Sequence, residues 1–291
     1  MIRRLAALVS ALALTLTTAS SAASPTFVWK ATSPSGAVVY LGGSVHLLSA
    51  DFYPLPAAYD EAFNASDLLV EELDMGEMLA PGTQMQMLSK GMLPPGQTLD
   101  RTLKPETISE VSAAVTAMGL PIEPLKMFKP WMLAITLQSM AWQKAGFDAN
   151  LGLDKHFYDR AKQGGKTVKG LETLDYQLSR FDGLPADAQE RMLLETVREL
   201  DKTKDEFTRL VSAWKSGNIA DVEKQVLDDL KNEPEMNARL LVERNRTWLP
   251  IIEALFARPK PAFVVVGAAH LVGSDGLVAL LRSKGYTVTQ Q

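Results

Sequence analysis

The sequence predicts an α/β fold, with a central mixed sheet, helices on both faces of the sheet and a helical insertion. Short runs rich in β-branched and aromatic residues alternate with longer stretches whose apolar residues recur at three-and-four spacing, as in amphipathic helices. The run at residues 262–266 is apolar throughout, which is typical of strands buried on both faces. Two helical blocks, at roughly residues 75–160 and 175–257, lie far from most strands in sequence. We therefore expect helices of these blocks to form a lid or groove wall.

Six strands are expected in chain order. The first two form a hairpin, because Ser33-Pro-Ser-Gly36 supplies turn residues between them. Gly119, Gly146 and Gly217 are stop signals that divide the helices. The strands are expected at residues 27–32, 37–41, 67–73, 166–170, 262–266 and 285–289, and the longer helices at residues 106–118, 130–144, 153–163, 186–215, 219–230 and 234–256.

The first 23 residues have the pattern of a secretory signal peptide. Arg3 and Arg4 precede an apolar run over residues 5–16, and small residues follow it. The run is too short for a comfortable transmembrane span, so an uncleaved anchor helix is the less favoured alternative. We expect the signal peptide, residues 1–23, to be removed, and residues 24–291 to be exported as a single domain without a membrane span.

Composition excludes several classes of protein. The chain has 291 residues, of which 46% are hydrophobic and 22% charged, as in soluble globular proteins. Removal of residues 1–23 takes away two positive charges and changes the net charge from −4 to −6, which argues against nucleic acid as a partner. The chain has no cysteine, so disulfides and lipid-modified cysteine are excluded, and metal ligands must be histidine, carboxylate or methionine.

Two of the three histidines end the same short motif. His46 and His270 each stand three residues after a glycine, at the end of an apolar strand. Glycine at a strand end permits a tight turn or a close backbone approach. Open α/β sheets place their ligand sites at the carboxyl ends of strands. A single such histidine is more often structural, but two matching turns favour one shared site.

Acidic residues also follow predicted strands. Glu71 and Glu72 stand at the end of the third strand and point to opposite faces of it, so the sequence leaves open which of them faces the site. Glu172 follows the short fourth strand. Each is a candidate metal ligand or general base, and the alternative is a solvated strand end. Asp154 and His156 are secondary candidates that diverge on a predicted helix, where Asp154 is alternatively an acid placed near the helix dipole.

The last long predicted helix contains an unusually polar turn around Arg244 and Asn245. These two side chains are candidates for orienting a carboxylate or binding a substrate carbonyl, and the alternative is a solvated helical turn. The segment that ends at His46 is not a nucleophile elbow, which needs glycine at that position. No His-Glu-x-x-His, Walker A or Gly-x-Gly-x-x-Gly motif is present. The methionine-rich stretch over residues 75–92 is better explained by packing than by a copper site.

The sequence motifs around these candidate residues together resemble those of the TraB/GumN family, which is related to the Tiki metalloproteases. The resemblance implies a metal-dependent hydrolase that acts on peptide bonds, with His46, Glu72 and His270 holding the ion. The wider superfamily contains erythromycin-esterase-like enzymes and haem-binding lipoproteins. The resemblance therefore implies that these proteins share the fold of this chain. It also implies a periplasmic location. The motifs are Leu41-Gly-Gly-Ser-Val-His-Leu-Leu48, Val70-Glu-Glu-Leu-Asp74, Gly152-Leu-Asp-Lys-His-Phe157, Gly170-Leu-Glu-Thr173, Glu243-Arg-Asn245 with Trp248, and Gly267-Ala-Ala-His-Leu-Val-Gly273.

The chemistry expected of such a site is metal-assisted hydrolysis of a peptide or small-molecule substrate. Two histidines and one carboxylate suit manganese, cobalt, iron or zinc. The ion would polarise a carbonyl and lower the pKa of bound water toward about 7. Glu71 or Glu172 is the expected general base, and Arg244 and Asn245 would steady the substrate or the developing oxyanion. The alternatives are an esterase-type hydrolase and a non-enzymatic envelope protein that binds haem, metal or peptide.

Overall fold

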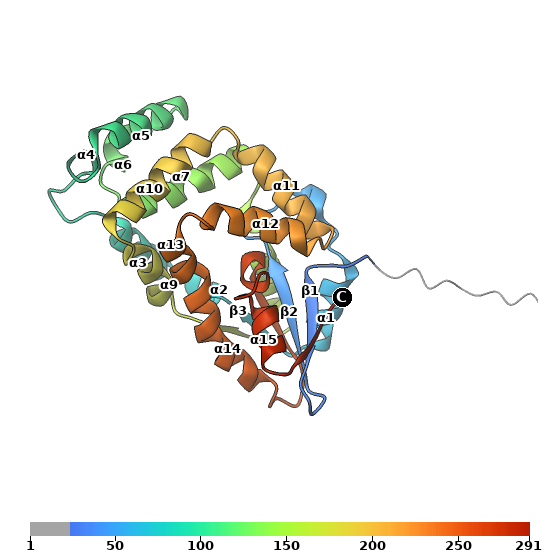
Figure 1. The fold of residues 1–291 in the computed structure, drawn as a ribbon. Coiled ribbons are helices and arrows are strands. Elements are labelled where there is room, and N and C mark those ends of the chain that lie inside the picture. The colour runs from blue at the N-terminus through green and yellow to red at the C-terminus, as the bar shows by residue number, and fades with distance from the viewer. Residues whose placement is uncertain (1–23) are drawn as a thin grey trace, which may run out of the picture.

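The protein is described by a computed structural model over residues 24–291, and the predicted signal peptide lies outside these residues. The six expected strands form one mixed sheet in the order β4-β3-β5-β2-β1-β6, which confirms the α/β class (Figure 1). Among residues 24–291, no helix is both long and apolar enough to span a membrane. The strands are β1 (Val28–Thr32), β2 (Val38–Ser44), β3 (Leu68–Glu71), β4 (Thr167–Gly170), β5 (Ala262–Gly267) and β6 (Thr287–Gln290).

The register of the parallel strands brings the candidate residues to one edge of the sheet. Central strand β5 pairs in parallel with β2 on one side and β3 on the other. Gly267 lies opposite Ser44, so the turns that lead to His46 and His270 leave the sheet side by side. Glu71 lies opposite Val265 on β5 and opposite Gly170 on β4, so all four strand ends meet here.

Helices pack on both faces of the sheet. On one face the Phe263 ring of β5 packs edge-on against Phe157 of α8 (Leu153–Gln163), with their ring centres 5.2 Å apart. Helix α1 (Ala57–Ala65) joins this face through Tyr59, which stacks on Phe157. On the other face lie α14 (Glu243–Leu255) and α15 (Leu277–Ser283), which pack against each other.

A second hydrophobic cluster lies away from the sheet. It is built by α4 (Leu99–Thr102), α5 (Pro105–Ala117), α7 (Pro130–Lys144) and α10 (Ala186–Glu199), which gather at one end of the molecule (Figure 1). The expected helix over 186–215 is wrong as a single element, because the chain leaves α10 before α11 (Thr203–Lys215) begins. Helix α11 then packs on the main core with Val211 and Trp214. The remaining helices are α2 (Met75–Met78), α3 (Pro81–Gly91), α6 (Ile122–Leu125), α9 (Leu174–Asp182), α12 (Ile219–Leu230) and α13 (Pro234–Asn237).

Candidate active site

Gly267 lies next to the three residues of the candidate centre, His46, Glu72 and His270. Its backbone N–H donates to Glu72 Oε1 at 2.7 Å. A Cβ added at this glycine would lie 3.2 Å from Glu72 Oε1, 3.6 Å from His46 Nε2 and 3.7 Å from His270 Cδ2. Three predicted site residues from three strand ends therefore converge on the open face of one glycine.

His270 is held as a neutral imidazole with its Nε2 lone pair directed to the centre. Its Nδ1–H donates to Asn245 Oδ1 at 2.7 Å, and Asn245 is oriented by its own Nδ2 bond to the Asp275 carbonyl at 2.8 Å. Trp248 covers the ring, with the two ring centres 4.5 Å apart. Burial lowers the pKa of His270 to about 3. Asn245 therefore acts on His270 rather than facing a substrate.

His46 is paired with Asp154, a residue predicted only as a secondary candidate. Its Nδ1 lies 2.8 Å from Asp154 Oδ2, and the charge of Asp154 raises the pKa of His46 to about 9. Asp154 lies in the first turn of α8, and two contacts hold this turn against the segment that ends at His46. The Leu153 N–H donates to the Val45 carbonyl, and Gly152 packs directly on the His46 carbonyl. The His46 side chain is 59% exposed, whereas that of His270 is 4% exposed.

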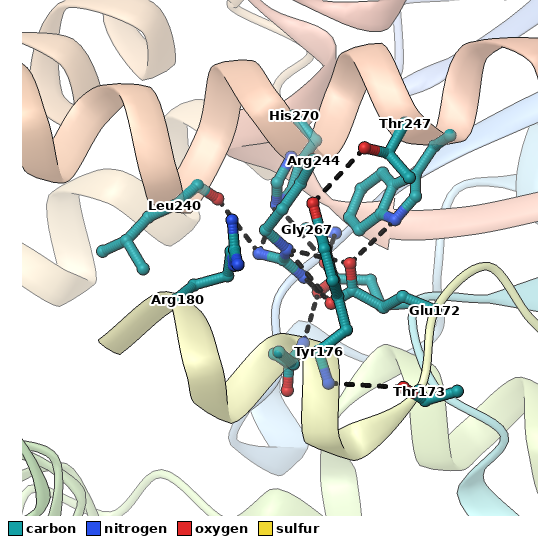
Figure 2. Close-up of polar contacts among 12 residues, drawn as sticks. Glu172, Thr173, Tyr176, Arg180, Leu240, Arg244, Thr247, Gly267 and His270 are labelled. Carbon is teal, nitrogen blue, oxygen red and sulfur yellow. Dashed lines mark hydrogen bonds and ion pairs between the residues drawn. The ribbon is translucent and has the colours of Figure 1, made fainter. Parts of the chain in front are cut away.

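Arg244 lies at the middle of the network, and all five of its N–H groups are used (Figure 2). Nε donates to Glu172, and Nη2 donates to Glu172 Oε1 at 2.8 Å and Glu72 Oε2 at 2.5 Å. Nη1 donates to the Leu240 carbonyl at 3.1 Å and to His270 Nε2 at 3.0 Å. The N–H groups of the guanidinium are therefore all engaged by the protein, two of its acceptors are the carboxylates of Glu72 and Glu172, and its role toward a substrate stays a prediction.

The pKa values of the two carboxyl groups that contact Arg244 are shifted in opposite directions. Burial alone would raise the pKa of Glu72, but Arg244 and the nearby histidines hold it below its ordinary value, so Glu72 is ionised. Burial raises the pKa of Glu172, whose oxygens accept from Arg244 and from Trp248 Nε1 at 2.8 Å. Both oxygens of Glu172 are thus engaged, which leaves it poorly placed as a general base.

Glu71 and His156 are not brought to the centre. Glu71 faces the α8 side of the sheet, its two carboxylate oxygens are buried without a hydrogen-bond partner, and burial raises its pKa to about 9. His156 packs against Tyr53, with ring centres 5.2 Å apart, and lies beside Arg160. The divergence of Asp154 and His156 on α8 follows from their spacing of two residues.

A π-helical turn, η3 (Ala238–Val242), precedes α14 and was not predicted. Widened turns of this kind are frequent at functional sites. Here the Leu240 carbonyl at its centre accepts a hydrogen bond from Arg244, so the turn helps to direct the guanidinium inward. No glycine or proline within the turn signals it in the sequence.

Helix α9 crosses beside α14 next to the network. Tyr176 OH lies 3.3 Å from Thr247 Oγ1 (Figure 2). Arg180 pairs with Glu243 at 2.9 Å. From the same helix, Gln177 Nε2 donates to Glu72 Oε2 at 3.3 Å. These contacts account for the burial of Glu72, which leaves His46 as the exposed member of the centre.

Over residues 24–291, no three His, Asp or Glu side chains stand ready as a metal-binding group. His270 Nε2 and Glu72 Oε1 are 3.8 Å apart, somewhat wider than the roughly 3.4 Å between two ligands of a tetrahedral zinc ion. The obstacle is Arg244, whose Nη1 takes the single Nε2 lone pair of His270. The donors fit a divalent ion in kind, and they would need to move closer together, with Arg244 giving up this bond, to hold one.

The fold and the paired turns define an α/β protein with a histidine–carboxylate centre at the sheet edge. The chain belongs to the TraB/PrgY/gumN family, whose sequence profile matches residues 27–290. It is 26% identical over 267 residues to the uncharacterized protein YbaP of Escherichia coli (strain K12), across 88% of this chain and 93% of that protein. The uncharacterized YbaP of Shigella flexneri matches to the same extent. No solved structure matches the chain.

Proposed function

We propose that the chain is an exported, periplasmic, metal-dependent hydrolase that cleaves peptide bonds, with fold relatives among erythromycin esterases and haem-binding lipoproteins. The convergence of His46, Glu72 and His270 on the open face of Gly267 carries the proposal. Two imidazoles and a carboxylate are a donor set for zinc, manganese, cobalt or iron that leaves coordination positions open. A bound ion would supply Lewis-acid polarisation of the scissile carbonyl and an acidified water.

The chain's own residues prepare the donors. Asn245 fixes the tautomer of His270, so that its Nε2 carries the lone pair. Asp154 orients His46 in the manner of the carboxylate–histidine pairs found around metal sites. Arg244 keeps Glu72 ionised. Peptide is expected to approach from the side of His46, because this side chain is the exposed member of the centre.

Arg244 places a fixed positive charge beside Glu72. If His46, Glu72 and His270 held an ion, Arg244 Nη1 would give up its bond to His270 Nε2, and its bonds to Glu172 and to the Leu240 carbonyl would keep the guanidinium beside the centre. We therefore expect ion binding to shift Arg244 toward Glu172.

The three histidines of the chain make a matched test. The protein is stripped with a chelator, reloaded with each of the four metals, and assayed for bound ion by elemental analysis and for cleavage of a peptide library. We expect one ion per chain and metal-dependent cleavage in the wild type. Both should be lost in His46→Ala and His270→Ala and kept in His156→Ala. Peptide cleavage that survives in His46→Ala and His270→Ala contradicts the proposal.

The His46–Asp154 pair favours a second candidate, a metal-independent esterase-type hydrolase. A carboxylate that orients an imidazole is the arrangement of a general base, whose other ring nitrogen takes a proton from water. Its activity should survive chelation, vanish in Asp154→Asn and rise toward pH 9, because the pKa of His46 is raised to about 9. Stoichiometric binding without turnover, with a Soret band in the case of haem, would instead identify a binding protein.

A further inference from the structure

The carbonyl of Gly43 is held by two buried aromatic side chains from distant parts of the chain. Tyr59 OH on α1 donates to it at 2.7 Å, and Trp214 Nε1 on α11 donates to it at 2.8 Å. Each side chain is 1% exposed, and their ring centres are 5.8 Å apart. The Gly43 N–H donates to the Phe27 carbonyl at 2.7 Å, so both polar groups of this glycine are fixed.

The position of Gly43 gives these hydrogen bonds their importance. Gly43 is the glycine of the first Gly-x-x-His turn, three residues before His46. The pairing of β1 with β2 ends at Val28 opposite Gly42, whereas Gly43 still pairs with Val266 of β5, so the Gly43 carbonyl lies beyond the β1–β2 ladder. Tyr59 and Trp214 thus take the place of β1 as donors just before the first histidine turn begins.

Gly43 also sets the distance between the two turns. A Cβ at this position would lie 2.8 Å from the Phe27 ring and 3.3 Å from the Cα of Ala268, which follows Gly267. The first turn therefore packs on the backbone of the second. A displacement of Gly43 would move His46 relative to His270.

We propose that Tyr59 and Trp214 are positioning residues that hold His46 at its distance from Glu72 and His270. This inference rests on the proposed function only in treating His46 as a member of the centre. Trp214 belongs to α11, which also packs against α7 of the second cluster and against α12. One indole N–H therefore ties the helical part of the molecule to the first histidine turn.

The test compares Trp214→Phe and Tyr59→Phe, singly and together, with Trp131→Phe as the matched control. Trp131 is also 1% exposed, and its Nε1 donates to Asp182 Oδ1 at 3.1 Å, so its replacement likewise removes one indole hydrogen bond. Three measurements are made on the full mature chain. These are thermal unfolding, affinity for Mn²⁺ and Zn²⁺ by calorimetry, and the ring ¹⁵N shifts of His46 by NMR.

We expect each single variant to weaken ion binding about threefold. The double variant should weaken it by more than tenfold, which is the range of about 10–100-fold seen for residues that orient metal ligands. The double variant should exceed the combined single effects, because only there does the buried carbonyl lose every side-chain donor. Trp131→Phe should lose similar thermal stability and keep the ion affinity and the His46 shifts of the wild type.

Unchanged affinity and unchanged His46 shifts in the double variant overturn the positioning role. A wild type that binds none of the metals overturns the proposed function instead. In that case the ¹⁵N shifts alone decide the inference: movement of the His46 signals in the double variant but not in Trp131→Phe supports it, and identical signals reject it.

Discussion

Two adjacent glutamates, Glu71 and Glu72, lie on opposite faces of the sheet in different environments. Glu72 meets the guanidinium of Arg244, which keeps its pKa low. Glu71 is buried with neither oxygen hydrogen-bonded, and burial, together with the negative charge of Asp154, raises its pKa to about 9. At neutral pH the first is a carboxylate and the second a neutral acid.

Glu71→Gln is expected to stabilise the protein increasingly as pH rises. Native Glu71 keeps its proton up to about pH 9, while in the unfolded chain it ionises near pH 4.5. Stability of the wild type therefore falls between these values, because the unfolded state binds fewer protons. The variant lacks this loss and should gain roughly 2 kcal/mol or more over the wild type between pH 5 and pH 9. Urea unfolding of both proteins at several pH values measures this gain in unfolding free energy. A stability difference between the two proteins that does not vary with pH contradicts the prediction.

Asp154→Asn is expected to return the pKa of His46 from about 9 toward its ordinary value of 6.5. The pair stabilises the fold fully below pH 6.5, and this contribution is lost as pH rises through about 9. Because His46 is largely exposed, the contribution should stay below about 1 kcal/mol. NMR titration of the three histidines measures the shift, with His156 as the internal reference. An unmoved His46 titration speaks against the pairing.

At this scale the sequence predicts the residue types of the centre but not their partners. His46 and His270 are visible because each histidine is a near neighbour of its own glycine in the chain. The acceptors of Arg244 come from β-strand ends, η3 and the second turn, and spacing carries no information about which N–H meets which acceptor. The sequence therefore marks Arg244 as a candidate without saying that it contacts Glu72 and Glu172.

At the scale of elements, η3 and α14 together position the side chains that surround His270 and Glu72. Arg244, Asn245 and Trp248 all come from α14 and face the centre together, although Arg244 and Asn245 are consecutive. The wide turn just before them contributes the Leu240 carbonyl. The strand ends could be predicted, since each is an apolar run that stops at glycine or acid. The π turn and the break between α10 and α11 could not, since neither glycine nor proline interrupts those stretches.

Deletion of Ala238 is expected to convert η3 into a regular α-helical turn and to rotate the preceding chain relative to α14 by about 100°. The Leu240 carbonyl would no longer face Arg244, so ion binding should fall at least tenfold while the helix content seen by circular dichroism stays unchanged. Arg239→Ala is the control, because it removes only the ion pair of Arg239 with Glu235. Wild-type ion affinity in the deletion variant argues against a role for the turn.

At the scale of the molecule, the helical part is divided between two cores. Helices α11, α12 and α14 contribute to the main core with the sheet, while α4, α5, α7 and α10 form the second cluster. The two helical blocks recognised in the sequence therefore do not form the insertion as wholes. Apolar periodicity identifies a helix and its buried face, but it does not say which core that face enters.

Leu133→Ala is expected to separate stability from function. Leu133 is fully buried in the second cluster, and its truncation should cost about 2–5 kcal/mol of unfolding free energy. Ion affinity should stay unchanged in the folded protein. Leu41→Ala makes the same truncation at a fully buried position on β2, and it should lower both stability and ion affinity because β2 carries the first turn. Equal loss of affinity in both variants is the contrary result.

The strand order determines when the centre can form as the chain is made. Strand β5, which separates β2 from β3, begins only at Ala262, and β6 pairs with β1 through the last residues of the chain. Until β5 has emerged, the N-terminal hairpin and β3 have no common partner, and the two histidine turns stay apart. A sheet that closes through such distant segments assembles slowly. The export that we propose gains from this delay, since a translocation channel would receive a chain that has not yet folded, and the candidate centre would assemble only after the crossing.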